Sequence, residues 1–228
     1  MHIVNAKNNF VSRAEEKLEG AVRAFHYDFR GKIVLDIGSS TGGFTELALN
    51  LGAAKVIAVE KGTNQMKTPL RHNPRIELHE KTDIFAVITR ESAATVTCSK
   101  EHKDSARAAR SVSEGHATVA ANSLIITDVD VILADVSFVS LTKILKYAKI
   151  HLARSNTDFL VMLKPQFEAK PYQLNKGVVK NEKFRREIIK NFELWLKQND
   201  FVIIKKRDND LAGRNGNLER FYYLKLAK

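Results

Sequence analysis

The stretch from Lys32 to Phe44 constrains the fold more than any other part of the sequence. Residues 33–37 form an apolar run broken only by Asp36, which is typical of a strand buried on both faces of a sheet. Small residues follow at 38–43, and an amphipathic segment begins at Phe44. This succession of strand, glycine-rich turn and helix predicts an open α/β sheet with a ligand crevice at the carboxyl edge of its first strand.

The crevice has the features of a site for a ribose-bearing cofactor. The next apolar run ends at Glu60, 22 positions after Gly38, where such folds place an acid that accepts hydrogen bonds from ribose hydroxyls. The dinucleotide fingerprint Gly-x-Gly-x-x-Gly is absent, and Asp36 would repel a pyrophosphate. S-adenosylmethionine carries an ammonium and a sulfonium and no phosphate, so it suits the carboxylate. The alternative is that the glycines only pack a helix against a strand.

The predicted cofactor contacts follow from this geometry. Most lie in or beside the glycine-rich turn, while Asp83 follows a third strand near the position where such folds contact an adenine. The set is Asp36, Gly38, Ser39, Thr41, Gly42, Gly43, Phe44, Glu60, Asp83 and Asp135.

Strand and helix patterns alternate along the chain, which indicates an α/β fold with a mostly parallel sheet. Seven strands are expected, at residues 33–37, 55–60, 75–79, 130–135, 158–164, 201–204 and 221–226. Helices are expected at residues 11–27, 44–51, 61–73, 141–152 and 183–198, and we expect them to cover both faces of the sheet.

Two segments do not fit the alternating pattern. Residues 1–10 are polar and are expected to form a flexible arm ahead of one domain at 11–228. Residues 89–123 are rich in Ala, Ser and Thr and contain no Leu, Ile or aromatic residue. That composition buries too little surface to offset the entropy of ordering, so it predicts a low-complexity insertion at about 89–123.

Composition limits the class of protein and its partners. The 228 residues suffice for one large domain, and no apolar run is long enough to span a membrane. The single cysteine, Cys98, fits a reducing cytoplasm, and nothing indicates a metal site. Lys and Arg outnumber Asp and Glu by 20 to 9 after residue 142 and balance them before it. This asymmetry favours a polyanionic partner, although many small proteins are merely basic.

Three charged residues stand at the carboxyl ends of predicted strands: Asp36, Asp135 and Lys164. Ligands bind at that edge of an open α/β sheet, so these side chains are candidates for chemistry. A lysine that closes an apolar run directly before Pro165 is unusual. It can be a catalytic group, or it can form a structural salt bridge with Asp135. Lys17 precedes the first strand and could overhang the crevice, although its pattern alone fits a solvated lysine.

Six motifs in one order carry a family resemblance. They are Ser12–Leu18 (SRAEEKL), Leu35–Thr45 (LDIGSSTGGFT), Ala134–Ser140 (ADVSFVS), Leu163–Glu168 (LKPQFE), Lys176–Val179 (KGVV) and Gly216–Glu219 (GNLE). Together they resemble the TlyA family of ribosomal RNA 2′-O-methyltransferases, relatives of the FtsJ type. The resemblance covers nearly the whole chain apart from the predicted insertion.

The resemblance implies a Rossmann-like class I methyltransferase fold, with S-adenosyl-L-methionine as cofactor and ribosomal RNA or ribosomal subunits as partner. It also implies a catalytic tetrad at Lys17, Asp135, Lys164 and Glu219. Two departures are visible. Family members usually begin with an S4-type RNA-binding module, whereas this sequence starts almost at the expected catalytic domain, and Ala14 and Glu15 replace the usual glycines.

A mechanism follows from the resemblance and from general chemistry. A ribose 2′-hydroxyl is a poor nucleophile, so a base or a positive field must help it lose its proton. Lys164 is assigned that task, with Asp135 orienting its ammonium and Lys17 and Glu219 completing the cluster. Whether Lys164 accepts the proton or only stabilises the alkoxide stays open.

Two alternatives from other functional classes are retained. One is a methyltransferase with a small-molecule or protein acceptor, which would not need the basic last third. The other is a non-enzymatic RNA-binding or haemolysin-like protein, although no segment resembles a membrane-inserting helix. The target nucleotide, the ribosomal subunit and the oligomeric state are left undetermined.

Overall fold

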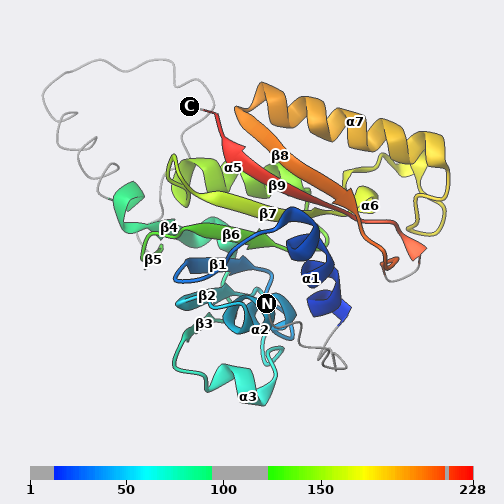
Figure 1. Ribbon diagram of the computed structural model, residues 1–228. Helices are drawn as coiled ribbons and strands as arrows, with labels where there is room; N and C mark the ends of the chain where they lie inside the picture. The colour runs from blue at the N-terminus through cyan, green and yellow to red at the C-terminus, as the bar shows by residue number, and fades with distance from the viewer. Residues whose placement is uncertain (1–12, 94–122, 214–215, 228) are drawn as a thin grey trace, which may run out of the picture.

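A seven-stranded sheet runs through the protein in the order β3-β2-β1-β6-β7-β9-β8 (Figure 1). The computed structural model describes residues 13–93, 123–213 and 216–227. The strands of this sheet are β1 (Ile33–Ile37), β2 (Lys55–Val59), β3 (Ile76–His79), β6 (Val131–Ala134), β7 (Asp158–Leu163), β8 (Phe201–Asp208) and β9 (Arg220–Leu226). Strand β9 pairs antiparallel with both β7 and β8, and the other neighbouring strands pair in parallel. The predicted mostly parallel seven-stranded sheet is therefore confirmed.

Helices cover both faces of this sheet, as the sequence predicts. Helices α1 and α2 lie on one face, and α5 and α7 lie on the other (Figure 1). The helices are α1 (Arg13–Phe25), α2 (Gly43–Asn50), α3 (Thr68–Arg71), α5 (Leu141–His151), α6 (Pro165–Glu168) and α7 (Glu182–Gln198). Short 3₁₀ turns lie at Ile84–Ala86 and Pro171–Gln173, and residues 90–93 are also helical.

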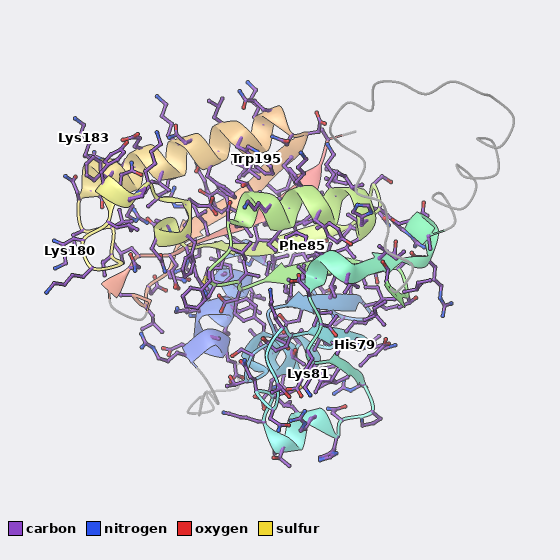
Figure 2. The ribbon with its side chains drawn as sticks, turned by 180° about the vertical axis from the view of Figure 1, so that it is seen from behind. His79, Lys81, Phe85, Lys180, Lys183 and Trp195 are labelled. Carbon is purple, nitrogen blue, oxygen red and sulfur yellow. The ribbon has the colours of Figure 1, made fainter. Side chains whose placement is uncertain are left out.

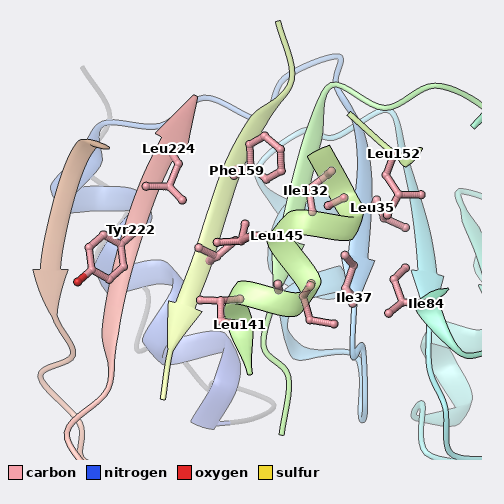
Figure 3. Packing of buried hydrophobic residues seen from close by; sticks show 14 of the residues in the cluster. Leu35, Ile37, Ile84, Ile132, Leu141, Leu145, Leu152, Phe159, Tyr222 and Leu224 are labelled. Atoms are coloured by element: carbon pink, nitrogen blue, oxygen red, sulfur yellow. The ribbon is translucent and has the colours of Figure 1, made fainter. Parts of the chain in front are cut away.

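Each face has its own hydrophobic core because successive side chains of a strand point to opposite faces. Val34 packs with α1 and α2, whereas its neighbour Leu35 packs with α5. Figure 3 shows Leu35, Ile132 and Phe159 in the second core, beneath Leu145 of α5. Burial on both faces explains why the central strands read as continuous apolar runs.

Local signals set the helix ends near the sheet. The Ser140 hydroxyl accepts a hydrogen bond from the Thr142 backbone N–H at 3.2 Å and so caps α5. Asn181 caps α7 in the same way, at 2.9 Å from the Lys183 nitrogen. Pro165 stops β7 and becomes the first residue of α6, a position where its missing N–H costs nothing. These ends fix where the loops at the carboxyl edge begin.

The structure departs from the predicted elements in several places. The helix predicted at residues 61–73 is reduced to α3 (Thr68–Arg71), and α6 was not predicted. A separate parallel pair, β4 (Val87–Thr89) and β5 (Leu124–Ile126), was not predicted. Strand β8 continues past Ile204 to Asp208 although its last residues are charged. It can do so because β8 is an edge strand, and because Asp208 lies 2.6 Å from both Arg185 and Arg220.

The two segments predicted to be irregular fall mostly outside the described residues. The arm at 1–10 and residues 94–122 of the predicted insertion are among them. At the first margin of the insertion, Thr89 belongs to β4 and is buried, with its hydroxyl 3.4 Å from the His151 carbonyl oxygen. Helix α1 is described from Arg13 and ends at Phe25, two residues before the predicted end. None of the described helices has the length and apolar character needed to cross a membrane.

Candidate active site

The turn between β1 and α2 is shaped by two glycines with left-handed backbones. Gly38 has φ +80°, and a Cβ there would stand 3.1 Å from the Asp135 carbonyl oxygen. Gly42 has φ +93°, and its Cβ would meet Leu70 of α3 at 2.6 Å. Both positions therefore exclude a side chain for reasons of space as well as strain. Gly38 lets the ends of β1 and β6 approach closely, and Gly42 lets the turn pack against α3.

A cavity of about 650 Å³ opens at the carboxyl ends of β1, β2 and β6. Four of the predicted cofactor residues line it: Gly38, Glu60, Asp83 and Asp135. Val59, Ile144 and Phe85, the last labelled in Figure 2, are among its apolar lining, and polar side chains such as Thr82 and Ser137 line it as well. A mostly apolar cavity of this size with a few convergent acids is typical of a small-molecule site.

Glu60 and Asp83 hold the rim of the cavity. The two oxygens of Glu60 accept backbone hydrogen bonds from Ser40 at 2.9 Å and Gly62 at 2.7 Å. A carboxylate has about four acceptor positions, so Glu60 keeps capacity for ligand hydroxyls. Asp83 pairs with Lys61 at 2.9 Å and accepts from the Phe85 nitrogen at 3.2 Å. Partial burial favours a raised pKa at Asp83, but these two hydrogen bonds outweigh it and lower the pKa.

The other predicted cofactor residues do not line this cavity. They are Asp36, Ser39, Thr41, Gly42, Gly43 and Phe44. Phe44 points into the core on the α1 face, where its ring centroid lies 5.9 Å from that of Phe221. The backbone of the turn thus borders the cavity at Gly38 and Ser40, while its later residues begin α2.

Asp36 lies beneath the turn and is fully buried. One of its oxygens accepts a hydrogen bond from the Thr45 hydroxyl at 2.6 Å, and the other has no protein partner within the described residues. Burial raises the pKa of Asp36 to about 7, against the smaller lowering effect of Thr45 and with support from the nearby charge of Asp135. A neutral carboxyl group at this position is favoured at moderately acid pH.

We expect the wild-type protein to lose stability as the pH rises towards 7, and we expect Asp36→Asn to remove that loss. The folded protein holds the Asp36 proton up to about pH 7, whereas the unfolded chain releases it near 3.8. The raised pKa therefore contributes stability that is complete below pH 3.8 and disappears as the pH rises through about 7. The slope is about 1.4 kcal/mol per pH unit in that window.

Urea unfolding of the wild type and of Asp36→Asn at pH 5 and pH 7 checks this expectation. Other titrating groups are common to both proteins, so the difference between their free energies of unfolding isolates Asp36. That difference should move by roughly 2–3 kcal/mol in favour of the variant on going to pH 7. A difference that does not change with pH would contradict the raised pKa.

Lys164 and Asp135 form an ion pair beside the cavity. The Lys164 Nζ lies 2.6 Å from Asp135 Oδ1 and donates a hydrogen bond to the Ser137 hydroxyl at 2.9 Å. The two side chains of the pair are 12% and 19% exposed. Asp135 and Ser137 also line the cavity. The lysine head group is therefore held at the place where a second reactant could meet a bound cofactor.

Lys17 and Glu219 form a second and more deeply buried pair. Lys17 Nζ lies 2.5 Å from Glu219 Oε2, and the side chains are 10% and 4% exposed. Asn209 donates to the same oxygen at 3.3 Å. Gly213 packs so closely that a Cβ there would stand 2.5 Å from Glu219 Oε1. This carboxylate is thus enclosed on several sides by polar and backbone groups.

Sheet register brings the two pairs to the same edge. Leu163 of β7 is opposite Arg220 of β9, so Lys164 and Glu219 are the next residues on adjacent antiparallel strands. Asp135 follows β6, which pairs in parallel with β7. Because β9 runs antiparallel, its amino end lies at the carboxyl ends of β6 and β7. The four residues of the predicted tetrad therefore gather at one edge of the sheet as two ion pairs.

Sequence reasoning did not single out several residues of this region. Ser137 lies inside the quoted motif Ala134–Ser140, so that motif contained a signal for it. Asn209 and Gly213 carried none beyond their place in a glycine-containing loop. Phe138 was also passed over, although it is 93% exposed and has φ +64° at the mouth of the cavity. Its ring lies 5.4 Å from that of Phe167.

The sheet order, the glycine turn and the acid at the end of β2 define an α/β nucleotide-cofactor protein of the methyltransferase class. The sequence model of the FtsJ-like methyltransferases matches residues 10–226, and this chain belongs to that family. Its chemistry is accordingly S-adenosylmethionine-dependent methyl transfer.

Individual relatives support the same assignment. A 23S rRNA (cytidine-2′-O)-methyltransferase TlyA of Campylobacter jejuni is 30% identical over 94% of this chain and 70% of the relative. A 16S/23S rRNA (cytidine-2′-O)-methyltransferase TlyA of Mycobacterium tuberculosis is 30% identical over 98% and 71%. A solved structure of a Lactococcus lactis protein described as a hemolysin superposes with a TM-score of 0.75 and 29% identity, covering 96% and 89%. Names of both kinds thus occur among proteins of similar sequence and fold.

Proposed function

We propose that this protein transfers a methyl group from S-adenosylmethionine to a ribose 2′-hydroxyl of ribosomal RNA. The proposal rests on two ion pairs, Lys164–Asp135 and Lys17–Glu219, which lie at the sheet edge that borders the cavity. The names of the relatives from C. jejuni and M. tuberculosis point to the same acceptor.

The residues around the cavity fit S-adenosylmethionine. Gly38 lines the cavity between the ends of β1 and β6, where its lack of a side chain lets the two strands approach closely. Glu60 has free acceptor capacity for ribose hydroxyls, and Asp83 stands beside the apolar surface of Phe85, which suits an adenine. S-adenosylmethionine supplies an electrophilic methyl group when it is bound. We assign its binding to Gly38, Glu60, Asp83 and the edge of Asp135.

The role of Lys164 follows from its contacts. An ammonium group has three donors. Lys164 donates a hydrogen bond to the Ser137 hydroxyl and forms an ion pair with Asp135, whose Oδ1 accepts no hydrogen bond within the described residues. Donor capacity therefore remains for an acceptor hydroxyl. A positive charge held beside the acceptor hydroxyl stabilises the alkoxide that develops as the oxygen attacks the methyl carbon. Asp135 and Ser137 fix the direction in which this positive charge points.

The surroundings of the cavity favour a nucleic-acid acceptor over a small molecule. Phe138 presents an almost fully exposed ring at the mouth, and exposed aromatic rings stack well on unpaired bases. The excess of positive charge after residue 142 provides an attraction for phosphates. A small-molecule methyltransferase needs neither feature.

We expect Glu60→Ala to weaken cofactor binding by roughly 10- to 100-fold, because it removes charge-assisted hydrogen bonds to ribose. Isothermal titration with S-adenosylmethionine measures the effect, and a thermal melt checks that the fold survives. Glu187→Ala, which alters an exposed acid on α7, is the matched control and should bind normally. Unchanged affinity in Glu60→Ala would remove Glu60 from the site.

The acceptor is tested by transfer of a labelled methyl group to small and large ribosomal subunits, followed by mapping of the modified nucleotide. A single 2′-O-methylated ribose is the expected product. Label on a ribosomal protein, on a base or on an added small molecule would contradict the proposal. Leakage of lipid vesicles with no transfer to RNA would support the haemolysin-like alternative instead.

A further inference from the structure

The segment between α6 and α7, residues 169–181, carries positive charges that take no part in the two ion pairs of the candidate active site. It contains three lysines, at 170, 176 and 180, and no Asp or Glu. All three lysines are exposed, and none forms an ion pair within the described residues. We call this segment the lysine loop. It begins five residues after Lys164, and α6 (Pro165–Glu168) lies between them.

The tip of the lysine loop is an ordered turn. Asn175 and Val178 exchange two backbone hydrogen bonds, at 2.8 and 3.0 Å. Between them Lys176 and Gly177 have φ values of +49° and +79°, the pattern of a type I′ turn. Val178 and Val179 are buried beneath the turn. The turn therefore projects Lys176 from a fixed base.

Asn217 ties this turn to the active site. Its side chain is 3% exposed, and its Nδ2 donates to the Gly177 carbonyl at 3.2 Å. Its Oδ1 accepts from the Val179 backbone nitrogen at 3.0 Å. Asn217 precedes Glu219 by two residues, and its own carbonyl accepts from Gly213 at 2.7 Å. The loop and the buried carboxylate of Glu219 thus share one short rigid connection.

Exposed lysines gather at this end of the molecule. Figure 2 shows Lys180 and Lys183 projecting outward where α7 begins. Tyr172 is 64% exposed on the same loop and packs edge-on against Phe184 at 5.9 Å. Glu182, at the start of α7, faces Arg185 at 3.6 Å. Lysines beside an exposed aromatic ring on a fixed loop suit a phosphodiester backbone with neighbouring bases.

We propose that the lysine loop binds the phosphate backbone of the RNA substrate through Lys176 and Lys180, and that Asn217 holds the loop in register with Glu219. The proposal rests on the proposed RNA 2′-O-methyltransferase function. A backbone anchored on this loop would present its ribose at a fixed distance from Lys164. Asn217 acts through the loop, so it is a positioning residue.

The test compares two double variants of equal charge change. Lys176→Gln/Lys180→Gln removes the loop charges, and Lys146→Gln/Lys197→Gln removes two exposed lysines on α5 and α7 that also lack ion pairs within the described residues. Binding of deproteinised 23S rRNA is measured at several salt concentrations. The loop variant should lower the slope of log K against log salt by about 1.4, since each lost single-strand contact is worth about 0.7. Its affinity should fall about tenfold, with S-adenosylmethionine binding unchanged.

A double-mutant cycle tests the role of Asn217. Asn217→Ala should weaken RNA binding in the wild-type background and add little in the Lys176→Gln/Lys180→Gln background, because the lysines it positions are gone. Equal losses in both backgrounds would contradict the positioning role. Loop and control variants with the same salt slope would overturn the loop as an RNA site. So would a loss of binding to whole subunits that deproteinised RNA does not reproduce. Methyl transfer by the wild-type protein tests the proposed function separately, since it requires neither result.

Discussion

Lys164→Met is expected to lower methyl transfer by a factor of about 10² or more while the protein stays folded and binds S-adenosylmethionine. Methionine removes the charge and keeps most of the side-chain bulk. The partner left behind, Asp135, is 19% exposed and lines the cavity, although its Oδ1, which faces Lys164, is itself buried. The cost in stability should therefore be well below that of breaking a fully buried pair.

A matched variant separates the catalytic role from a structural one. Lys32 forms an ion pair with Asp158 at 3.0 Å. Lys32 directly precedes β1 and Asp158 is the first residue of β7, so this pair lies at the amino ends of the parallel strands, opposite the candidate active site. Lys32→Met should cost stability and leave transfer per folded molecule unchanged. Single-turnover transfer, cofactor titration and melting temperature are measured for both variants. Near-normal 2′-O-methylation by a stably folded Lys164→Met protein would contradict the catalytic role of Lys164.

The fold could be predicted because its central strands obey one simple rule. A strand covered by helices on both faces is apolar over most of its length, and the runs at β1, β2, β6 and β7 are, apart from Asp36, Lys55 and Asp158. The strand pair β4–β5 was not predicted because its two short strands lie on either side of the low-complexity segment, far apart in the sequence. The continuation of β8 was not predicted because a run of charged residues normally indicates the end of a strand. In this strand, ion pairs at Asp208 compensate those charges.

The candidate site was only partly readable from sequence. Acids at strand ends, such as Glu60 and Asp135, could be assigned to the sheet edge because parallel strands end together. The function of individual turn residues could not be assigned in this way, since Gly42 packs against Leu70 and Phe44 packs against Phe221. The sequence does not distinguish a glycine that a ligand requires from one that a neighbouring helix requires.

The pairing of Lys17 with Glu219 lay beyond any local pattern. The two residues are 202 positions apart and meet only because β9 inserts between β7 and β8 in the antiparallel direction. The resemblance named both residues, but the short distance and deep burial of the pair are properties of the three-dimensional structure. Asn209 and Gly213, which enclose Glu219, depend on the same arrangement.

Lys17→Met is expected to abolish transfer and also to destabilise the protein by about 3 kcal/mol or more, because it strands a buried charge. Glu219 is 4% exposed and would keep only Asn209 as a side-chain partner within the described residues. This double effect makes the single variant ambiguous. Loss of activity could follow from loss of structure alone.

The companion variant Lys17→Met/Glu219→Gln resolves the ambiguity. A neutral amide at 219 can still accept from Asn209 and leaves no unpaired charge, so most of the lost stability should return. If the pair serves the chemistry, transfer per folded molecule stays at least 10²-fold below wild type in the stable double variant. Denaturant unfolding and single-turnover transfer are measured on all three proteins. Recovery of transfer together with stability would show that Lys17 and Glu219 only hold α1 against β9, and it would leave Lys164 and Asp135 as the whole of the reactive centre.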